Sequence, residues 1–162
     1  MISVYIGLGS NLALPEKQIQ AACSSLAALP STALIMCSSL YQSQPMGPQD
    51  QPDFVNAVAL IETELSADTI LQHTQLIEIE QGRIRNANRW GPRTLDLDML
   101  LYGKQQIDKV HLQVPHYGMK QREFVLYPLF EIAPDLILPC GEKLSELLLT
   151  CPLNGLRKMA PL

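Results

Sequence analysis

The sequence lacks most features that identify a specialised class of protein. Its 162 residues contain no P-loop consensus, no Cys-x-x-Cys motif, no internal repeat and no low-complexity tract. Hydrophobic residues make up 47% of the chain, yet no apolar run reaches membrane-spanning length. These absences exclude a P-loop nucleotide site, a Cys-x-x-Cys metal or redox site and a transmembrane helix. We therefore expect one soluble domain over residues 1–162, with a full hydrophobic core.

The chain also lacks an excess of positive charge. Its net charge is −4 and its isoelectric point is about 5.3, whereas a broad nucleic-acid interface requires a basic face. A local cluster of arginines can still bind a small polyanion, which favours a nucleotide as the ligand. We expect a monomer without nucleic-acid or membrane partners.

The four cysteines are widely spaced and no signal peptide is evident, so we expect free thiols in a reducing cytoplasm. A disulfide pair stays possible at this stage, because separation in sequence does not fix distance in the fold. The four are Cys23, Cys37, Cys140 and Cys151.

Hydrophobic periodicity and turn residues predict an α+β fold. The predicted helices are 15–29, 66–83 and 120–132, and the predicted strands are 4–8, 33–41, 54–64, 95–102 and 110–114. The order β-α-β-β-α-β is typical of the ferredoxin-like arrangement, in which helices cover one face of an antiparallel sheet. Two polar segments, 42–53 and 84–93, are long enough to act as binding loops or lids over the other face.

Asp96 and Asp98 form the most informative pair in the sequence. On a strand, side chains at i and i+2 project to the same face about 7 Å apart, so both carboxylates point one way. Hard divalent cations prefer oxygen ligands, and Mg²⁺ is usually held by one or two carboxylates together with substrate phosphates. A solvated strand face is the alternative, but the neighbouring arginines and the single tryptophan, Trp90, favour a magnesium and phosphate site.

Arginines near this pair have planar guanidinium groups that suit phosphate oxygens. Each could instead be a solubilising surface residue. The candidates are Arg83, Arg85, Arg89, Arg93 and Arg122. By contrast, Gly7 and Gly9 do not begin a dinucleotide-binding motif, because Leu12 occupies the third glycine position, and we interpret them as a tight turn.

A second group of polar and aromatic residues follows Pro115. His116 could donate to a phosphate oxygen. Trp90 and Phe124 are candidates to stack on a planar ring, with core packing as the alternative for Phe124. Asn56 could pair with a heterocycle through its donor and acceptor atoms.

From about Tyr5 to Pro139 the chain resembles the hydroxymethyldihydropterin pyrophosphokinases of folate biosynthesis. The matching segments, in order, are Gly9–Asn11, Gly47–Asn56, Glu78–Arg85, Arg89–Asp98, and Pro115 to Tyr117 with Arg122 and Phe124. The resemblance implies a ferredoxin-like fold and two Mg²⁺ ions. It also implies transfer of the terminal pyrophosphoryl unit of ATP to the hydroxymethyl oxygen of 6-hydroxymethyl-7,8-dihydropterin, with release of AMP.

The same resemblance assigns roles to individual residues. It makes Asp96 and Asp98 the ligands of both magnesium ions, and adds Arg83 and Arg93 as residues that assist transfer. The implied pterin pocket comprises Ser43, Met46, Gly47, Phe54, Asn56, Trp90 and Phe124. The implied ATP site comprises Gln75, Glu78, Arg85, Arg93, Met99, His111, Leu112, Gln113, His116, Tyr117 and Arg122.

Two positions depart from the family pattern. His111 stands where an arginine is common, which predicts weaker or pH-dependent ATP binding, and Phe54 stands where a tyrosine is common. Two other functions remain open on the residues alone. One is a ferredoxin-like nucleotidyl transferase that releases pyrophosphate. The other is a non-catalytic RNA-binding or ligand-binding module, which would need a basic surface and aromatic residues exposed on strands.

Overall fold

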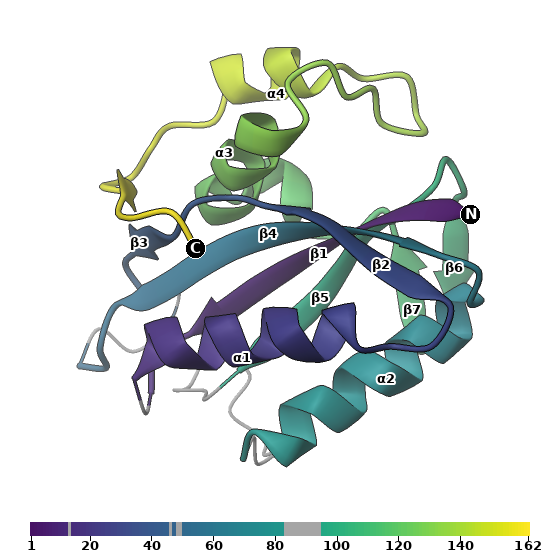
Figure 1. Cartoon of the computed structure of the whole chain (residues 1–162). Helices are drawn as coiled ribbons and strands as arrows, with labels where there is room; N and C mark the ends of the chain where they lie inside the picture. Colours follow the sequence, from purple (N-terminus) through teal and green to yellow (C-terminus); the bar gives the residue numbers. More distant parts are fainter. Residues whose placement is uncertain (13, 46, 48–49, 83–94) are drawn as a thin grey trace.

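The protein has an α+β fold in which helices pack against both faces of an antiparallel sheet (Figure 1). The computed structural model describes residues 1–12, 14–45, 47, 50–82 and 95–162. The strands are β1 (Ile2–Ser10), β2 (Thr32–Cys37), β3 (Tyr41–Ser43), β4 (Phe54–Thr63), β5 (Asp96–Tyr102), β6 (Ile107–Lys109), β7 (Leu112–Val114) and β8 (Arg157–Lys158). The helices are α1 (Pro15–Ala27), α2 (Ala67–Glu80), a 3₁₀ helix at Met119–Gln121, α3 (Glu123–Ile132) and α4 (Leu144–Leu149).

The main sheet has the strand order β5-β1-β4-β3-β8, and β2 pairs with the other end of β4. Because β2 and β3 both pair with β4, they together occupy the place of one ferredoxin-like strand. Every pair in the sheet is antiparallel, and β1 lies between β5 and β4. The predicted fold class is therefore confirmed.

Helices α1 and α2 cover one face of the sheet, as expected. Pro15 occupies the first turn of α1, where its missing N–H costs no hydrogen bond, and Ser66 caps α2 by accepting a hydrogen bond from the Thr69 N–H. Ile19 and Leu26 from α1 and Ile70 from α2 are fully buried against this face. Burial of these apolar side chains holds both helices on the sheet.

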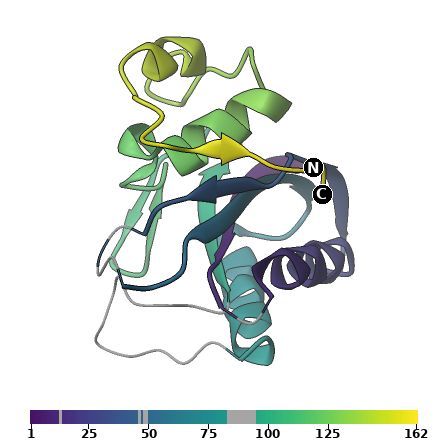
Figure 2. The same cartoon turned by 90° about the vertical axis from the view of Figure 1, so that its left-hand side faces the viewer.

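Helices α3 and α4 pack on the opposite face, and Figure 2 shows them across the sheet from α1 and α2. The prediction that helices cover one face alone is therefore wrong, because apolar residues of β4 and β5 on the second face also need a packing partner. Val58 of β4 and Leu100 of β5 form a second core with Leu126 and Leu129 of α3. Asp96 and Asp98 project to this second face, because side chains alternate along β5 and Leu100 lies two residues beyond Asp98. Part of this face is thus packed core, and part carries the two carboxylates.

Two predicted elements are wrong in detail. The predicted strand 33–41 is interrupted between β2 and β3, where Ser39 donates both its N–H and its hydroxyl to the Glu131 carboxylate of α3. The predicted helix 120–132 is broken at Arg122, which is extended with φ −108° and ψ 109°. The short elements β6, α4 and β8 were not predicted.

Within the described part of the chain, no helix combines the length and apolar character needed to cross a membrane. All four cysteines are free, and the Sγ atoms of Cys23 and Cys37 lie 3.6 Å apart.

Candidate functional site

The two carboxylates of β5 lie on a strand that is hydrogen-bonded to helix α2. Asp96 pairs with Gly9 and Asp98 pairs with Gly7 across the β1–β5 ladder. Between them, the Leu97 N–H donates to a Glu78 carboxylate oxygen at 2.8 Å. Glu78 is only 2% exposed, so this contact is shielded from water and fixes the backbone that carries both aspartates.

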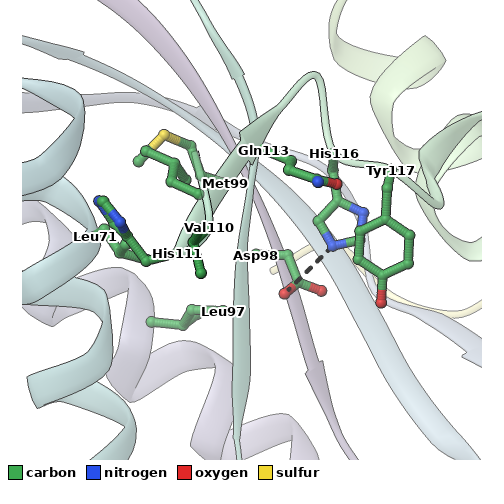
Figure 3. Close-up of a pocket in the computed structure, with 10 residues that line it drawn as sticks. Leu71, Leu97, Asp98, Met99, Val110, His111, Gln113, His116 and Tyr117 are labelled. Atoms are coloured by element: carbon green, nitrogen blue, oxygen red, sulfur yellow. Dashed lines mark ion pairs between the residues drawn. The ribbon is translucent and has the colours of Figure 1, made fainter. Parts of the chain in front are cut away.

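His116 approaches Asp98 from the segment that follows β7. Its backbone N–H donates to the Leu100 carbonyl, and its ring Nδ1 accepts from the Gly118 N–H at 3.1 Å. Because Nδ1 is an acceptor, the proton of the neutral ring resides on Nε2. This Nε2 lies 3.8 Å from the nearer Asp98 carboxylate oxygen (Figure 3). An N–H donor and a carboxylate therefore face the same small volume.

Three aromatic and cationic groups extend the site beyond His116. The His116 and Tyr117 rings stack with their centroids 4.6 Å apart. The Arg122 guanidinium carbon lies 5.6 Å from the Tyr117 ring centre and 5.8 Å from the Phe124 ring centre. A side chain on Gly118 would place its Cβ 2.7 Å from that guanidinium carbon, so this position of Arg122 requires a glycine.

A cavity of about 520 Å³ opens beside these groups and is suited to a small ligand. Leu71 and Met99 lie at one end, while Asp98, His116 and Tyr117 lie at the other (Figure 3). The full lining comprises Leu71, Leu97, Asp98, Met99, Val110, His111, Leu112, Gln113, His116 and Tyr117. Apart from the His111 ring beside Leu71, one end is thus apolar, and the other carries charge and hydrogen-bonding groups, which suits a ligand with a ring and an anionic tail.

A second polar group lies across the sheet on β3 and β4. The Asn56 side-chain NH₂ donates to the Ser43 hydroxyl at 2.6 Å, and both residues are almost fully buried. Gly9 lies between Asp96 and Asn56 in the ladder, so the three positions form one row across β5, β1 and β4. A Cβ on Gly9 would lie 3.2 Å from the Asn56 side-chain oxygen, and the missing side chain keeps this row clear.

The prediction of a tight turn at Gly7 and Gly9 is wrong, because both residues lie inside β1. Alternate glycines on a strand leave one face of the strand bare. Just after β1, Asn11 contacts the predicted loop 42–53. Its side chain donates to the Gln51 side-chain oxygen at 2.9 Å and to the Pro52 carbonyl at 3.0 Å.

The structure brings together many of the predicted ATP-site residues. Those that line the cavity are Met99, His111, Leu112, Gln113, His116 and Tyr117. Of the predicted pterin residues, Ser43 and Asn56 are in contact and Phe54 begins the same strand as Asn56, whereas Phe124 lies beside Arg122. Gln75 and Gly47 are not part of the cavity lining. The predicted residues outside the described part of the chain are Met46, Arg83, Arg85, Arg89, Trp90 and Arg93.

Sequence reasoning missed three residues of the cavity lining: Leu71, Leu97 and Val110. Leu71 and Leu97 are apolar residues at periodic positions, and such a position carries no signal that separates core from ligand contact. Val110 is fully exposed at the turn of the β6–β7 hairpin, which was not predicted.

Comparison with known proteins places the chain among enzymes. A protein of Pseudomonas aeruginosa named 2-amino-4-hydroxy-6-hydroxymethyldihydropteridine pyrophosphokinase is 55% identical over 156 residues, which are 96% of each chain. The protein of the same name from Haemophilus influenzae is 56% identical over 147 residues, which are 91% of each chain. The chain is accordingly an enzyme of the pyrophosphokinase class.

The family follows from a match to a protein-family model. The family model described as 7,8-dihydro-6-hydroxymethylpterin-pyrophosphokinase (HPPK) matches residues 5–134. This chain belongs to the HPPK family, a family of transferases in folate biosynthesis.

Longer proteins contain the same unit. The folic acid synthesis protein fol1 of Schizosaccharomyces pombe is 40% identical over 154 residues, which are 94% of this chain and 21% of that protein. A crystal structure of Plasmodium falciparum HPPK-DHPS with pteroate has a TM-score of 0.72 at 13% identity, and the match covers 90% of this chain and 41% of that one. An HPPK-DHPS crystal structure with substrates has a TM-score of 0.70 at 11% identity over 91% of this chain and 44% of that one. The likeness to these structures shows a shared fold.

Proposed function

We propose that this enzyme transfers the terminal pyrophosphoryl unit of ATP to 6-hydroxymethyl-7,8-dihydropterin and releases AMP. The hydroxymethyl oxygen attacks the β-phosphorus of ATP and loses its proton. The bond between that phosphorus and the oxygen bridging to the α-phosphorus breaks, and its electron pair leaves with AMP. The observation that carries the proposal is the placement of Asp98 and His116 at one end of a cavity whose other end is mainly apolar.

The donor set of the site fits magnesium. Asp96 and Asp98 offer carboxylate oxygens from one face of β5, and the Asp98 side chain is 36% exposed, so substrate phosphates have access to it. We propose that these two residues hold two Mg²⁺ ions. Magnesium supplies charge neutralisation for the ATP phosphates and activation of the attacking hydroxyl.

The residues of the cavity are proposed to bind and orient ATP. The apolar walls at Leu71 and Met99 suit a planar base, and the His116 Nε2–H can donate to a phosphate oxygen near Asp98. Arg122, held against two aromatic rings, adds positive charge on the same side. Arg85, Arg93 and Arg83 are proposed as further phosphate-binding and transfer-assisting residues on the strength of the family resemblance.

The pterin is proposed to bind near the row Asp96–Gly9–Asn56. Asn56 has donor and acceptor atoms that match the edge of a pterin ring, and its hydrogen bond to Ser43 sets the orientation of its amide. Phe54 and Gly47 are proposed as further pterin contacts on the strength of the family resemblance. Met46, Trp90 and Phe124 remain proposed pterin contacts, with stacking between Trp90 and Phe124.

Product analysis tests the reaction. The protein is mixed with ATP, Mg²⁺ and 6-hydroxymethyl-7,8-dihydropterin, and the nucleotides and pterins are separated by chromatography. We expect equal amounts of AMP and a pterin diphosphate, formed only with Mg²⁺ present. Formation of ADP and a pterin monophosphate, or release of free pyrophosphate, would contradict pyrophosphoryl transfer.

A further inference from the structure

One wall of the cavity is formed by the small β6–β7 hairpin, whose second strand and turn differ in how they contact the rest of the protein. Strands β6 and β7 pair with each other in a separate two-stranded sheet. Leu112 and Val114 of β7 are buried in the main core, so β7 is held by apolar packing. Val110, in the turn itself, is fully exposed and adds no such packing.

A single carboxylate on α2 contacts both sides of this turn. One Asp68 oxygen accepts a hydrogen bond from the Lys109 ammonium at 3.0 Å, and the other lies 2.9 Å from the His111 Nε2. Lys109 and His111 flank Val110, so the two contacts bracket the turn. The three side chains are each about half exposed.

Asp68 therefore joins the two walls of the apolar end of the cavity. It lies in the first turn of α2, one turn before Leu71, which lines the cavity from the helix side. Val110 and His111 line it from the hairpin side. The pKa of Asp68 is lowered, chiefly by the hydrogen bond from His111 and then by that from Lys109, which agrees with two donors converging on one charged group.

We propose that Asp68 is a positioning residue for the nucleotide, because its carboxylate holds the turn of the β6–β7 hairpin at a fixed distance from α2. The inference rests on the proposed binding of ATP in this cavity. With Asp68 present, Val110 and His111 face Leu71 across a preformed gap, and binding requires no further ordering of the hairpin. Without it, ATP must order the turn when it binds, and its affinity falls.

The test compares Asp68→Ala with a matched variant, Asp108→Ala, which removes an exposed carboxylate from the hairpin itself. Asp68→Asn is the conservative variant, because its amide keeps one acceptor oxygen for the two donors. We expect Asp68→Ala to raise the KM for ATP about three- to tenfold, the effect of losing two exposed polar contacts. The kcat and the KM for the pterin stay unchanged in Asp68→Ala. The KM for ATP of Asp68→Asn is intermediate, and that of Asp108→Ala matches the wild type.

Hydrogen exchange supplies a readout that needs no substrate. Amide exchange at 109–113 is expected to be faster in Asp68→Ala than in Asp108→Ala, with exchange in β1 and β4 unchanged. An unchanged KM for ATP with unchanged exchange would overturn the inference. A fall in kcat together with higher KM values for both substrates and a lower Tm would also overturn it, because it would show a structural role.

The two proposals fail in different ways. If the wild type binds Mg²⁺-ATP in calorimetry and Asp68→Ala binds it equally well, the positioning role is wrong and the proposed function stands. If the wild type does not bind Mg²⁺-ATP, the proposed function is contradicted, and the positioning role falls with it.

Discussion

The Leu97 N–H donates to the Glu78 carboxylate at 2.8 Å, and this contact joins α2 to β5 between the two aspartates. The N–H belongs to a strand residue that is 6% exposed and the acceptor to a helix residue that is 2% exposed. Hydrogen bonds of this kind are costly to break, because the group left behind is buried where water does not replace the lost partner. The position of both carboxylates thus depends on a residue of a different element.

Glu78→Ala is expected to lower both stability and turnover. Removal of the acceptor leaves the Leu97 N–H buried without it, so the free energy of unfolding falls by about 2 kcal/mol. The kcat falls with it, because the backbone between Asp96 and Asp98 loses its fixed position. Urea unfolding and steady-state kinetics measure the two effects. Glu78→Gln retains an acceptor oxygen and should keep most of both, and equal damage from Ala and Gln would contradict the explanation.

Gly9→Ala is expected to weaken pterin binding. The added Cβ would lie 3.2 Å from the Asn56 side-chain oxygen, so the Asn56 amide must move by a few tenths of an ångström, which misaligns the hydrogen bond that it offers to the pterin. Loss of one well-placed hydrogen bond corresponds to a rise in the pterin Kd of about tenfold. Gly7→Ala is the matched variant, because its Cβ meets Leu100 at 3.5 Å, an ordinary contact. Equal pterin Kd values for the two variants, measured by calorimetry, would argue against a role for the bare strand face at Gly9.

Gly118→Ala is expected to act through Arg122. The new Cβ would lie 2.7 Å from the guanidinium carbon, and the flexible end of Arg122 must move away from the Tyr117 and Phe124 rings. We expect the KM for ATP to rise about tenfold, the effect of losing one charge-assisted hydrogen bond. Gln121→Ala changes an exposed side chain in the same segment and should match the wild type. A normal KM for ATP in Gly118→Ala would show that Arg122 does not act from this position.

Glu131 is expected to make folding sensitive to acid. Burial raises the pKa of this carboxyl, but hydrogen bonds from Tyr41 and Ser39 outweigh it, and the net pKa lies below its ordinary value of 4.5. The folded state therefore binds fewer protons than the unfolded state near this pH, so the stabilisation is present above about pH 4.5 and is lost as pH falls towards the folded-state pKa.

Urea unfolding at pH 7 and at pH 4 measures this effect. Glu131→Gln should lower the free energy of unfolding at pH 7 by about 1–2 kcal/mol and reduce the difference between the two pH values. Asp135→Asn, at an exposed acid just beyond α3, is the control and should retain the wild-type pH dependence. An unchanged pH dependence in Glu131→Gln would refute the assignment.

The parts of the fold that rest on local pattern could be predicted from the sequence. The alternation around Asp96 and Asp98 predicted β5 and the shared face of the two carboxylates, and Ser66 marked the start of α2. The predictions failed where distant residues decide the structure. The break after β2 depends on Glu131, which lies 92 residues from Ser39 in sequence, and no local pattern reports that contact.

The same distinction holds for the candidate site. His116 and Tyr117 stood out because of their chemistry and the family resemblance, and they line the cavity. Leu71 did not stand out, because its place in the cavity depends on the β6–β7 hairpin lying opposite α2. The clearance at Gly9 likewise depends on the register between β1 and β4, which periodicity in a single strand cannot supply.

The most direct test of the central claim follows the phosphorus atoms of ATP by ³¹P NMR in the wild type and in Asp98→Asn. Mg²⁺, ATP and 6-hydroxymethyl-7,8-dihydropterin are present in both samples, and circular dichroism checks that the variant is folded. We expect the wild type to move the β- and γ-phosphorus together into a pterin diphosphate as AMP appears, and the folded variant to lose almost all of this transfer. Full transfer by Asp98→Asn, or movement of the γ-phosphorus alone in the wild type, would contradict the account.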